Sequence, residues 1–276
     1  MKPLTLGISP CPNDTFIFHA LLHGLVDGAP QMQVEFADID VLNERAAAGA
    51  LDLVKVSYGA LPWLLDDYTV LESGGAVGRG CGPLLLTADG RTPAELSGAR
   101  VAVPGLRTTA YLLLRLWAAG RVDFAAVDVL PFDQIMPAVQ AGRYDAGLVI
   151  HESRFTYPSY GLHSAVDLGA WWETDTGLPI PLGAILARRS LGPDAIAALT
   201  HAVRRSVEFA WADPAASRDY VMAHSQELEP AVAEAHIALY VNEFTRALGA
   251  EGKAAANALL ARATAAGLTP AVALGD

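Results

Sequence analysis

Apolar runs alternate with amphipathic stretches through the first 190 residues of the chain. TLGISP (5–10) and RVAVPG (100–105) are short apolar runs that stop at a proline, and their length and composition predict β-strands. Each leads into a longer stretch of helical period, TFIFHALLHGLV from Thr15 and TAYLLLRLWAAG from Thr109. A strand, a loop and a helix therefore occur twice, at an offset of about 94 residues.

Two later segments follow the same offset. AGALDLVKVS (48–57) and AGRYDAGLVIH (141–151) each combine an Ala-Gly helix end, an aspartate and a buried strand. Two copies of a βαβαβ unit predict an α/β protein of two lobes, each a mostly parallel sheet flanked by helices. The first copy ends at Ser57 and the second at His151.

Four residues follow predicted strands at comparable places: Ser9, Ser57, Pro104 and His151. In sheets of this kind, ligands bind beyond the carboxyl ends of the strands. We therefore expect two facing lobes to bring these residues to a common cleft.

The rest of the chain predicts how the lobes are connected. Residues 156–182 are typical of a long loop, and AILARRS from Ala184 predicts a strand that returns toward the first lobe. Beyond it the pattern is helical, with Pro193, Pro214 and Pro230 each near a helix start.

Two crossings between the lobes, near 84–88 and 182–186, would form a hinge. On this basis we expect lobe one, the larger, to comprise 1–87 plus 186–276, and lobe two to comprise 88–185.

Composition and charge exclude several partners. The 276 residues are 52% apolar, enough to fill two cores, and the formal charge of −11 is spread without a long acidic run, which disfavours nucleic acid. Residues 1–9 lack the pattern of a signal peptide, and no apolar run is long enough to span a bilayer. We expect a cytoplasmic protein without membrane contact or an evident obligate protein partner. Cys11 and Cys81 have no CxxC partner and are expected to be thiols.

The two predicted helix starts are candidate anion sites. Asn13 or Asp14 can cap the first helix, and Thr108 and Thr109 stand at the start of the second. A capped helix alone explains these residues, but a helix start facing a cleft also offers N–H groups and partial positive charge to an anion. Neither segment contains GxxxxGK[ST] or GxGxxG, which disfavours nucleotides.

His151 is the candidate base, because a neutral imidazole at a strand end facing a cleft can accept a proton. Glu152 could orient it, although a solvated carboxylate is the simpler interpretation. The six other histidines, among them His236, are more simply surface or core residues. A serine triad with Ser57 is disfavoured, since no GxSxG motif occurs and the two residues belong to different lobes.

Other chemistry-bearing residues have simpler explanations. Arg79 could pair with a substrate carboxylate or be an ordinary surface arginine, and Trp171 and Trp172 could stack on a ligand or pack between lobes. No HExxH, DxDxDG or paired HxH motif occurs, so the motifs give no support to a catalytic metal.

Several motifs together carry a family resemblance. SPCPNDTFIFHAL, DIDVLNERA, KVSYGAL, GRGCGPLLL, the TTAYLLL helix and IHESRFTY follow one another over most of residues 5–190. In this order they resemble the 1,4-dihydroxy-6-naphthoate synthase family of the futalosine route to menaquinone, with SPCPNDTF and HESRFTY the most specific.

The resemblance implies a type II periplasmic-binding-protein-like fold used by a cytoplasmic enzyme. The implied enzyme is a lyase that splits cyclic dehypoxanthinyl futalosine, a small carboxylate, into 1,4-dihydroxy-6-naphthoate and a three-carbon sugar fragment without metal or organic cofactor.

It also implies roles for particular residues. His151 corresponds to the proton acceptor, Lys55, Val56 and Ser57 to one substrate-binding segment, and Thr109 with Ala110 to another. We add Thr108 from its position at the cleft and Asn43 from the family motif.

The residues at hand suit this chemistry. Carbon–carbon cleavage beside a ring carbonyl needs a base, for which His151 is suited, and donors to an oxyanion, which Ser57 and the amides near Thr109 can supply. Two alternatives stay open. One is the chorismate dehydratase of the same pathway, and the other is a non-catalytic solute-binding protein for a small carboxylate.

Overall fold

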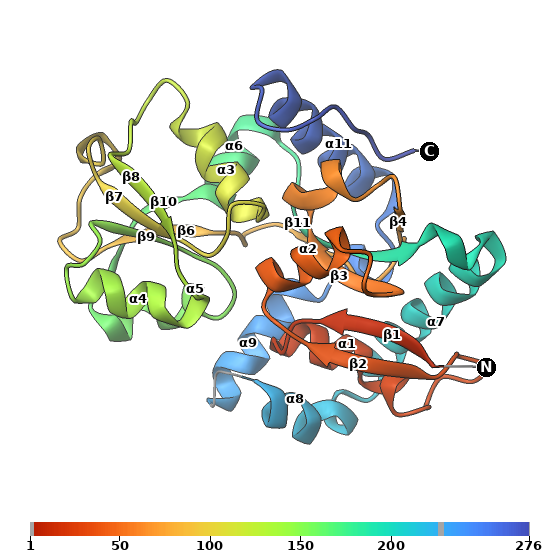
Figure 1. Ribbon diagram of the computed structural model, residues 1–276. Coiled ribbons are helices and arrows are strands. Elements are labelled where there is room, and N and C mark those ends of the chain that lie inside the picture. Colours follow the sequence, from red (N-terminus) through yellow and green to blue (C-terminus); the bar gives the residue numbers. More distant parts are fainter. Residues whose placement is uncertain (1–2, 226–228, 276) are drawn as a thin grey trace.

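The computed structural model describes residues 3–225 and 229–275 of the chain. Its strands form two sheets (Figure 1). The first has the order β2 (Met32–Phe36), β1 (Leu4–Ile8), β3 (Leu53–Ser57), β11 (Ile180–Arg188) and β4 (Tyr68–Val70), with β5 (Ala76–Gly78) also pairing with β11. The second has the order β10 (His163–Asp167), β6 (Leu84–Thr87), β9 (Ala146–Val149), β7 (Arg100–Val103) and β8 (Ala126–Val129).

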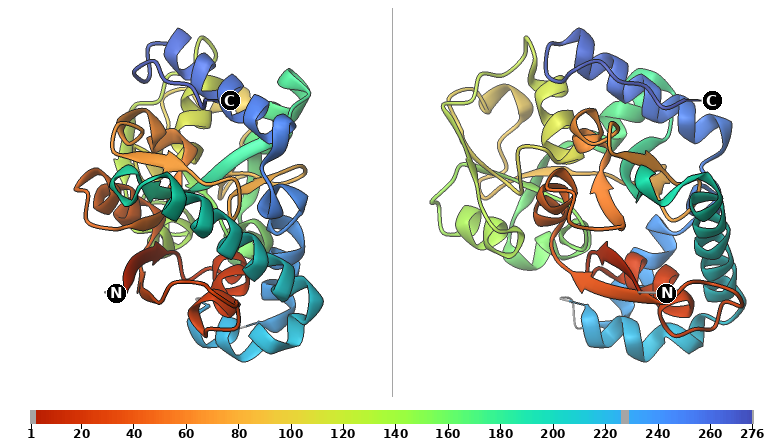
Figure 2. Two further views of the ribbon diagram at one scale, coloured as in Figure 1. Left: turned by 90° about the vertical axis from the view of Figure 1, so that its right-hand side faces the viewer. Right: turned by 45° about the vertical axis from the view of Figure 1, so that its right-hand side comes forward.

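The helices cover these sheets. They are α1 (Pro12–Leu22), α2 (Ile39–Ala47), α3 (Thr109–Ala118), α4 (Phe132–Gln140), α5 (Ser153–Thr156), α6 (Leu168–Thr176), α7 (Pro193–Ala212), α8 (Arg218–His224), α9 (Pro230–Tyr240), α10 (Glu243–Arg246) and α11 (Gly249–Ala265). Helices α7, α8 and α9 pack against α1, while α11 contacts both β11 and α3 (Figure 2). No helix in the described part of the chain is both long and apolar enough to span a bilayer.

The internal repeat is confirmed. In the first copy β1, α1, β2, α2 and β3 form the strand order β2-β1-β3, and in the second β7, α3, β8, α4 and β9 form the order β8-β7-β9. All four strand pairings within these copies are parallel. Each copy therefore directs the carboxyl end of its last strand, and the residues that follow, toward one edge of its sheet.

Both complete sheets are mixed, so the expectation of mostly parallel sheets is wrong outside the repeats. β11 pairs antiparallel with β3, β4 and β5, and β6 pairs antiparallel with β9 and β10. β6 and β11, the strands with which the chain enters the second sheet and returns to the first, run against the strands of the repeats.

The strands locate the crossings. One lies between Gly78 of the first sheet and Leu84 of the second, and the other between α6 and Ile180. Residues 84–87 thus pair in the second sheet and residues 180–185 in the first, a few residues from the predicted lobe ends. The lobe boundaries themselves stay a prediction.

Two further predictions can be compared with the structure. The expectation of a long loop over 156–182 is wrong, since β10 and α6 lie within it; Asp167 caps α6 by accepting a hydrogen bond from the N–H of Ala170 at 3.0 Å. The prolines are confirmed as helix starts at Pro193 and Pro230, and Pro214 begins a short 3₁₀ turn, Pro214–Ser217, ahead of α8.

Candidate active site

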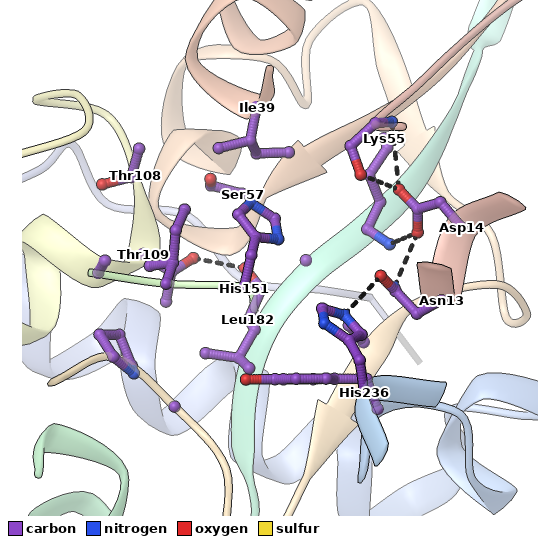
Figure 3. Close-up of a pocket in the computed structure, with 18 residues that line it drawn as sticks. Asn13, Asp14, Ile39, Lys55, Ser57, Thr108, Thr109, His151, Leu182 and His236 are labelled. Atoms are coloured by element: carbon purple, nitrogen blue, oxygen red, sulfur yellow. Dashed lines mark hydrogen bonds and ion pairs between the residues drawn. The ribbon is translucent and has the colours of Figure 1, made fainter. Parts of the chain in front are cut away.

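A cavity lies between the two sheets and is lined from both of them (Figure 3). It encloses about 630 Å³ of empty space including its mouth. The first sheet and its helices contribute Ser9, Asn13, Asp14, Ile39, Lys55, Ser57, Ala76, Leu182, Gly183, His236 and Tyr240. The second contributes Thr108, Thr109, Ala110, Ile150 and His151, and the first crossing contributes Gly82 and Pro83.

Six of the eight predicted site residues line this cavity: Lys55, Ser57, Thr108, Thr109, Ala110 and His151. The side chain of Val56 does not. Successive side chains of a strand point to opposite faces, so Lys55 and Ser57 face the cavity while Val56, fully buried, packs in the apolar core.

Asn43 lies behind Ser57 and not on the cavity wall. Its Oδ1 accepts a hydrogen bond from the backbone N–H of Ser57 at 2.9 Å, and its Nδ2 donates to Ser57 Oγ at 3.4 Å. Asn43 is therefore placed to hold the end of β3, with the Ser57 hydroxyl toward the cavity.

Asp14 is not the cap of the first helix, which corrects the expectation for Asn13 and Asp14. Helix α1 begins at Pro12 with Cys11 as N-cap, so both residues lie in its first turn. The Asp14 carboxylate accepts hydrogen bonds from the N–H and hydroxyl of Ser9 at 3.2 and 2.9 Å. It also forms an ion pair with Lys55, with 2.5 Å between Oδ1 and Nζ. The Asp14 carboxylate therefore neutralises the positive charge of Lys55 within the cavity wall.

Glycine makes room for this lysine. Gly183 of β11 lies beside it, and a Cβ at that position would stand 2.8 Å from Lys55 Cε.

The two threonine hydroxyls are bonded within the protein. Thr108 Oγ1 donates to the carbonyl of Gly105 at 2.8 Å and accepts from the N–H of Tyr111 at 3.1 Å, which makes Thr108 the N-cap of α3. Thr109 Oγ1 accepts from the N–H of Gly59 at 3.1 Å and donates to the carbonyl of Leu182 at 2.7 Å. Thr109 thereby joins the start of α3 to two segments of the first sheet's lobe.

The backbone amides of the α3 start remain available. Among the described residues, no group accepts a hydrogen bond from the N–H of Thr109 or Ala110, as is usual in a first helical turn. These donors, together with the partial positive charge of a ten-residue helix, are of the kind that bind an anionic oxygen.

His151 follows β9 in a conformation that few residues adopt. Its φ of 51° makes it the one non-glycine residue with positive φ in the described part of the chain. Its ring lies 6.5 Å from the His236 ring in a near-parallel stack and meets Phe132 edge to face at 5.3 Å. With this backbone and these ring contacts, His151 lines the cavity.

The His151 imidazole is neutral near physiological pH. Burial lowers its pKa to about 4, the charge of Asp14 opposes this shift, and that of Lys55 adds to it. A neutral ring keeps one nitrogen lone pair and can accept a proton.

His236 was missed by sequence reasoning, which left it as a surface or core histidine. It is 1% exposed and lines the cavity, with Nε2 3.0 Å from Oδ1 of Asn13. Burial lowers its pKa well below the usual value, with His151 and Lys55 as further causes. Helix α9 carries it to the first turn of α1, a tertiary contact for which the sequence pattern offers no signal.

Glu152 is buried, with 6% exposure, so the expectation of a solvated carboxylate is wrong. The Cys11 thiol donates toward its Oε2 at 3.8 Å and lies 3.2 Å from His151 Nδ1. The three donor atoms lie within 4.8 Å of one another, and their types are ones that zinc accepts, so this cluster of described residues could surround an ion.

Arg79 and the tryptophan pair lie outside the cavity lining. Arg79 forms an exposed ion pair with Glu251 at 2.7 Å. Trp172 is fully buried and donates from Nε1 to the carbonyl of Pro179 at 2.9 Å. These residues match their simpler interpretations, a surface arginine and a packing tryptophan.

Two α/β sheets with a cavity between them, lined by both strand-end regions, define the periplasmic-binding-protein-like class. The fold is shared with the alkanesulfonate-binding protein SsuA from Xanthomonas axonopodis, at a TM-score of 0.73 and 19% identity over 99% of this chain and 96% of the other. The predicted fold class is confirmed. The chain belongs to the menaquinone biosynthesis family, whose model matches residues 4–265.

Closer relatives agree with that assignment. The chain is 59% identical to a 1,4-dihydroxy-6-naphthoate synthase of Streptomyces coelicolor, over 98% of this chain and 95% of the relative. It is 54% identical to the enzyme of that name from Thermus thermophilus, over 97% and 96%. The solved structure of protein AF1704 from Archaeoglobus fulgidus is similar at a TM-score of 0.90 and 36% identity, over 96% and 98%. The resemblance noted in the sequence is confirmed.

Proposed function

We propose that this protein is a 1,4-dihydroxy-6-naphthoate synthase, a carbon–carbon lyase acting on cyclic dehypoxanthinyl futalosine with His151 as general base. The observation that carries the proposal is a neutral imidazole in the wall of a cavity whose opposite wall carries Ser57. The names of the two curated relatives support the choice of substrate. The predicted cytoplasmic location stays a prediction.

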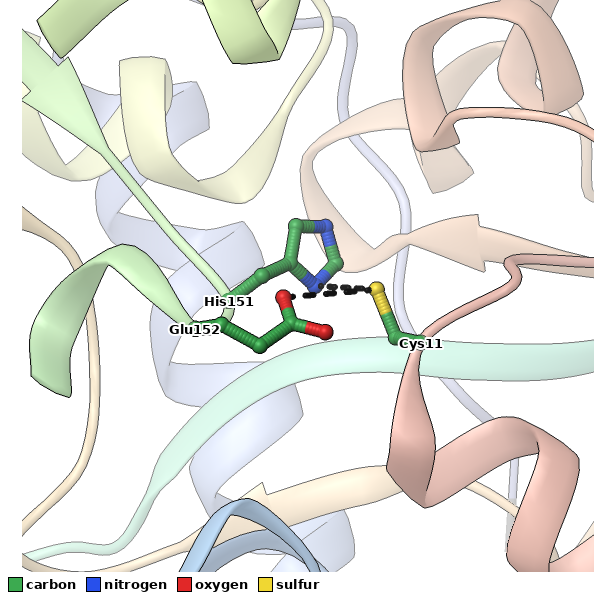
Figure 4. A group of neighbouring side chains, drawn as sticks. All are labelled: Cys11, His151 and Glu152. Atoms are coloured by element: carbon green, nitrogen blue, oxygen red, sulfur yellow. Dashed lines mark hydrogen bonds between the residues drawn. The ribbon is translucent and has the colours of Figure 1, made fainter. Parts of the chain in front are cut away.

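The base must have a nitrogen free to take the substrate proton. Nδ1 of His151 faces the Cys11 thiol, and no described residue makes a hydrogen bond to Nε2 (Figure 4). We assign Nε2 as the acceptor of the proton whose removal starts the cleavage. A negatively charged substrate would raise the pKa of His151 on binding and so make it a stronger base in the complex.

The anionic oxygen that develops on the substrate needs donors already in place. Thr109, Ala110 and Ser57 line the cavity, and we propose the two N–H groups and the hydroxyl as these donors; the contacts of Thr108, Thr109 and Asn43 hold the segments that carry them. Donors held in this way stabilise charge without reorganising during the reaction. We propose that proton transfer and hydrogen-bond donation suffice, without metal or organic cofactor.

The direct test compares wild-type protein with His151→Ala and His151→Gln. Loss of a general base is expected to lower turnover about 10²- to 10⁴-fold while the unfolding transition is retained. Mass spectrometry of dihydroxynaphthoate release measures the rate, and chorismate serves as the second substrate in parallel.

Each outcome is decisive. Wild-type turnover by His151→Ala would remove the assignment of the base. Loss of water from chorismate, with no naphthoate formed from the futalosine derivative, would favour the dehydratase. Binding of the futalosine derivative without turnover would favour the solute-binding protein.

A further inference from the structure

Cys11, His151 and Glu152 form a cluster that the proposed reaction leaves unexplained (Figure 4). Cys11 precedes α1 of the first repeat, whereas His151 and Glu152 follow β9 of the second, so the contact joins the two lobes. The thiol lies between the other two groups, 3.2 Å from His151 Nδ1 and 3.8 Å from Glu152 Oε2. Cys11 is not part of the cavity lining, so any effect of its thiol on a bound substrate passes through the histidine.

We propose that Cys11 is a positioning residue that fixes His151 in the tautomer with its proton on Nδ1, by accepting from Nδ1–H and donating its own S–H to Glu152. The inference rests on the proposed role of His151 as base. It assigns to the thiol the part that a carboxylate plays in a catalytic triad.

The direction of the two hydrogen bonds follows from how many protons are present. Burial and the charges of Glu152 and Asp14 raise the pKa of the Cys11 thiol well above its usual value, so the sulfur keeps its single proton. That proton can point at only one neighbour. Cys11 Sγ is the donor to Glu152 Oε2, and a carboxylate oxygen is a stronger acceptor than a neutral ring nitrogen, so the S–H points to Glu152.

The histidine must then supply the proton of its own contact with sulfur. With hydrogen on Nδ1, the neutral ring has its lone pair on Nε2. The reverse arrangement, with S–H donating to Nδ1, would place the ring proton on Nε2. Nε2 would then have no lone pair with which to accept the substrate proton.

The same two hydrogen bonds also stabilise the imidazolium that the proton transfer produces. The substrate C–H or O–H bond breaks, its proton forms a bond to Nε2, and the electron pair stays on the substrate. No proton leaves the thiol. The imidazolium keeps its Nδ1–H bond to sulfur, and the charge of Asp14 favours it whereas that of Lys55 opposes it.

The tautomer is measured independently of activity, by ¹⁵N NMR of histidine-labelled protein, with the His151 signals identified by their absence in His151→Ala. Wild-type protein is expected to show hydrogen on Nδ1. Cys11→Ala should shift the ring toward the Nε2–H form, and Cys11→Ser should restore the wild-type pattern, because a hydroxyl both accepts and donates. An unchanged tautomer in Cys11→Ala would overturn the proposal.

Turnover provides the second measurement. Cys11→Ala is expected to lower kcat about 10- to 100-fold with little change in KM, as for other groups that orient a functional histidine. Cys81→Ala is the matched control, because Cys81 is also a buried thiol but makes no contact with His151. If Cys11→Ala does not fold, Glu152→Leu supplies the same test by removing the acceptor of the S–H, and a wild-type tautomer in that variant would overturn the proposal.

Two controls separate the possible failures. Wild-type activity in His151→Ala would overturn the proposed function. An inactive His151→Ala together with an unchanged tautomer in Cys11→Ala would overturn only the role proposed for Cys11. Wild-type turnover is expected to be unaffected by EDTA. Loss of turnover on chelation would indicate that the three side chains bind a metal ion, and it would overturn the hydrogen bonds proposed for Cys11.

Discussion

The two βαβαβ repeats have the same strand order but equip the cavity differently. In the first, the turn into the helix supplies Asp14, whose charge is taken up by Lys55 from the end of β3. In the second, the equivalent turn supplies Thr108 and Thr109, whose hydroxyls are bonded within the protein and whose amides remain available. The first repeat therefore offers a balanced polar wall, and the second offers the proposed base and the proposed anion site. If these roles hold, similar backbones divide binding and proton transfer between them.

The largest effect on stability is expected from breaking the buried ion pair between Asp14 and Lys55 in the first repeat. Asp14→Asn leaves the Lys55 charge buried without its partner, which should lower the free energy of unfolding by about 3–5 kcal/mol. Denaturant unfolding measures it. Glu243→Gln, which removes an exposed partner of Arg246, is the control and should change stability by less than about 1 kcal/mol. Equal losses in the two variants would contradict a balanced wall.

The second repeat should show itself in the pH dependence of stability. The folded pKa of His151 is lowered to about 4, so below the unfolded value of about 6.5 the unfolded chain binds the additional proton. The stabilisation is complete above about pH 6.5 and is lost as the pH falls toward 4, by roughly 3 kcal/mol from this group. Unfolding of wild type and His151→Gln across this range isolates its share, and parallel curves would argue against a neutral ring in the folded protein.

The join between the repeats can be tested with one added methyl group. A Cβ at Gly59 would lie 2.9 Å from the carbonyl oxygen of Thr108, so Gly59→Ala should push the start of α3 away from the first lobe. We expect a loss of about 1–3 kcal/mol in stability. Weaker binding of the dihydroxynaphthoate product, measured by calorimetry, should accompany it, and unchanged affinity would contradict a ligand site at this join.

The smallest effect is expected from Thr109→Val, which keeps the shape of the side chain and removes its hydroxyl. The Gly59 N–H and Leu182 carbonyl lose their partner, at a cost of about 1–2 kcal/mol. Thr108→Ser is the control, since a serine still caps α3. If Thr109→Val were as stable as wild type, its hydroxyl would have no part in joining the lobes.

The sequence predicted what repeats and strand periods encode. The offset between Ser57 and His151 was enough to place both on one cavity, because a repeated strand order puts equivalent strand ends at equivalent edges. It did not predict the helix and strand within 156–182, where neither period is sustained. The buried state of Glu152 and the arrival of His236 depend on contacts between distant segments, which local patterns do not contain. Val56 shows that a motif match identifies a segment, whereas strand alternation decides which of its side chains faces the ligand.

The Thr109 hydroxyl has one consequence for how substrate enters. Its two hydrogen bonds run from the second half to Gly59 and Leu182 of the first half, so the two halves are already joined at the point where the substrate anion is expected to sit. We expect the entry of a bulky bicyclic substrate to require these two hydrogen bonds to break and re-form. We expect capture to be limited by that opening step, with an association rate that levels off as substrate concentration rises.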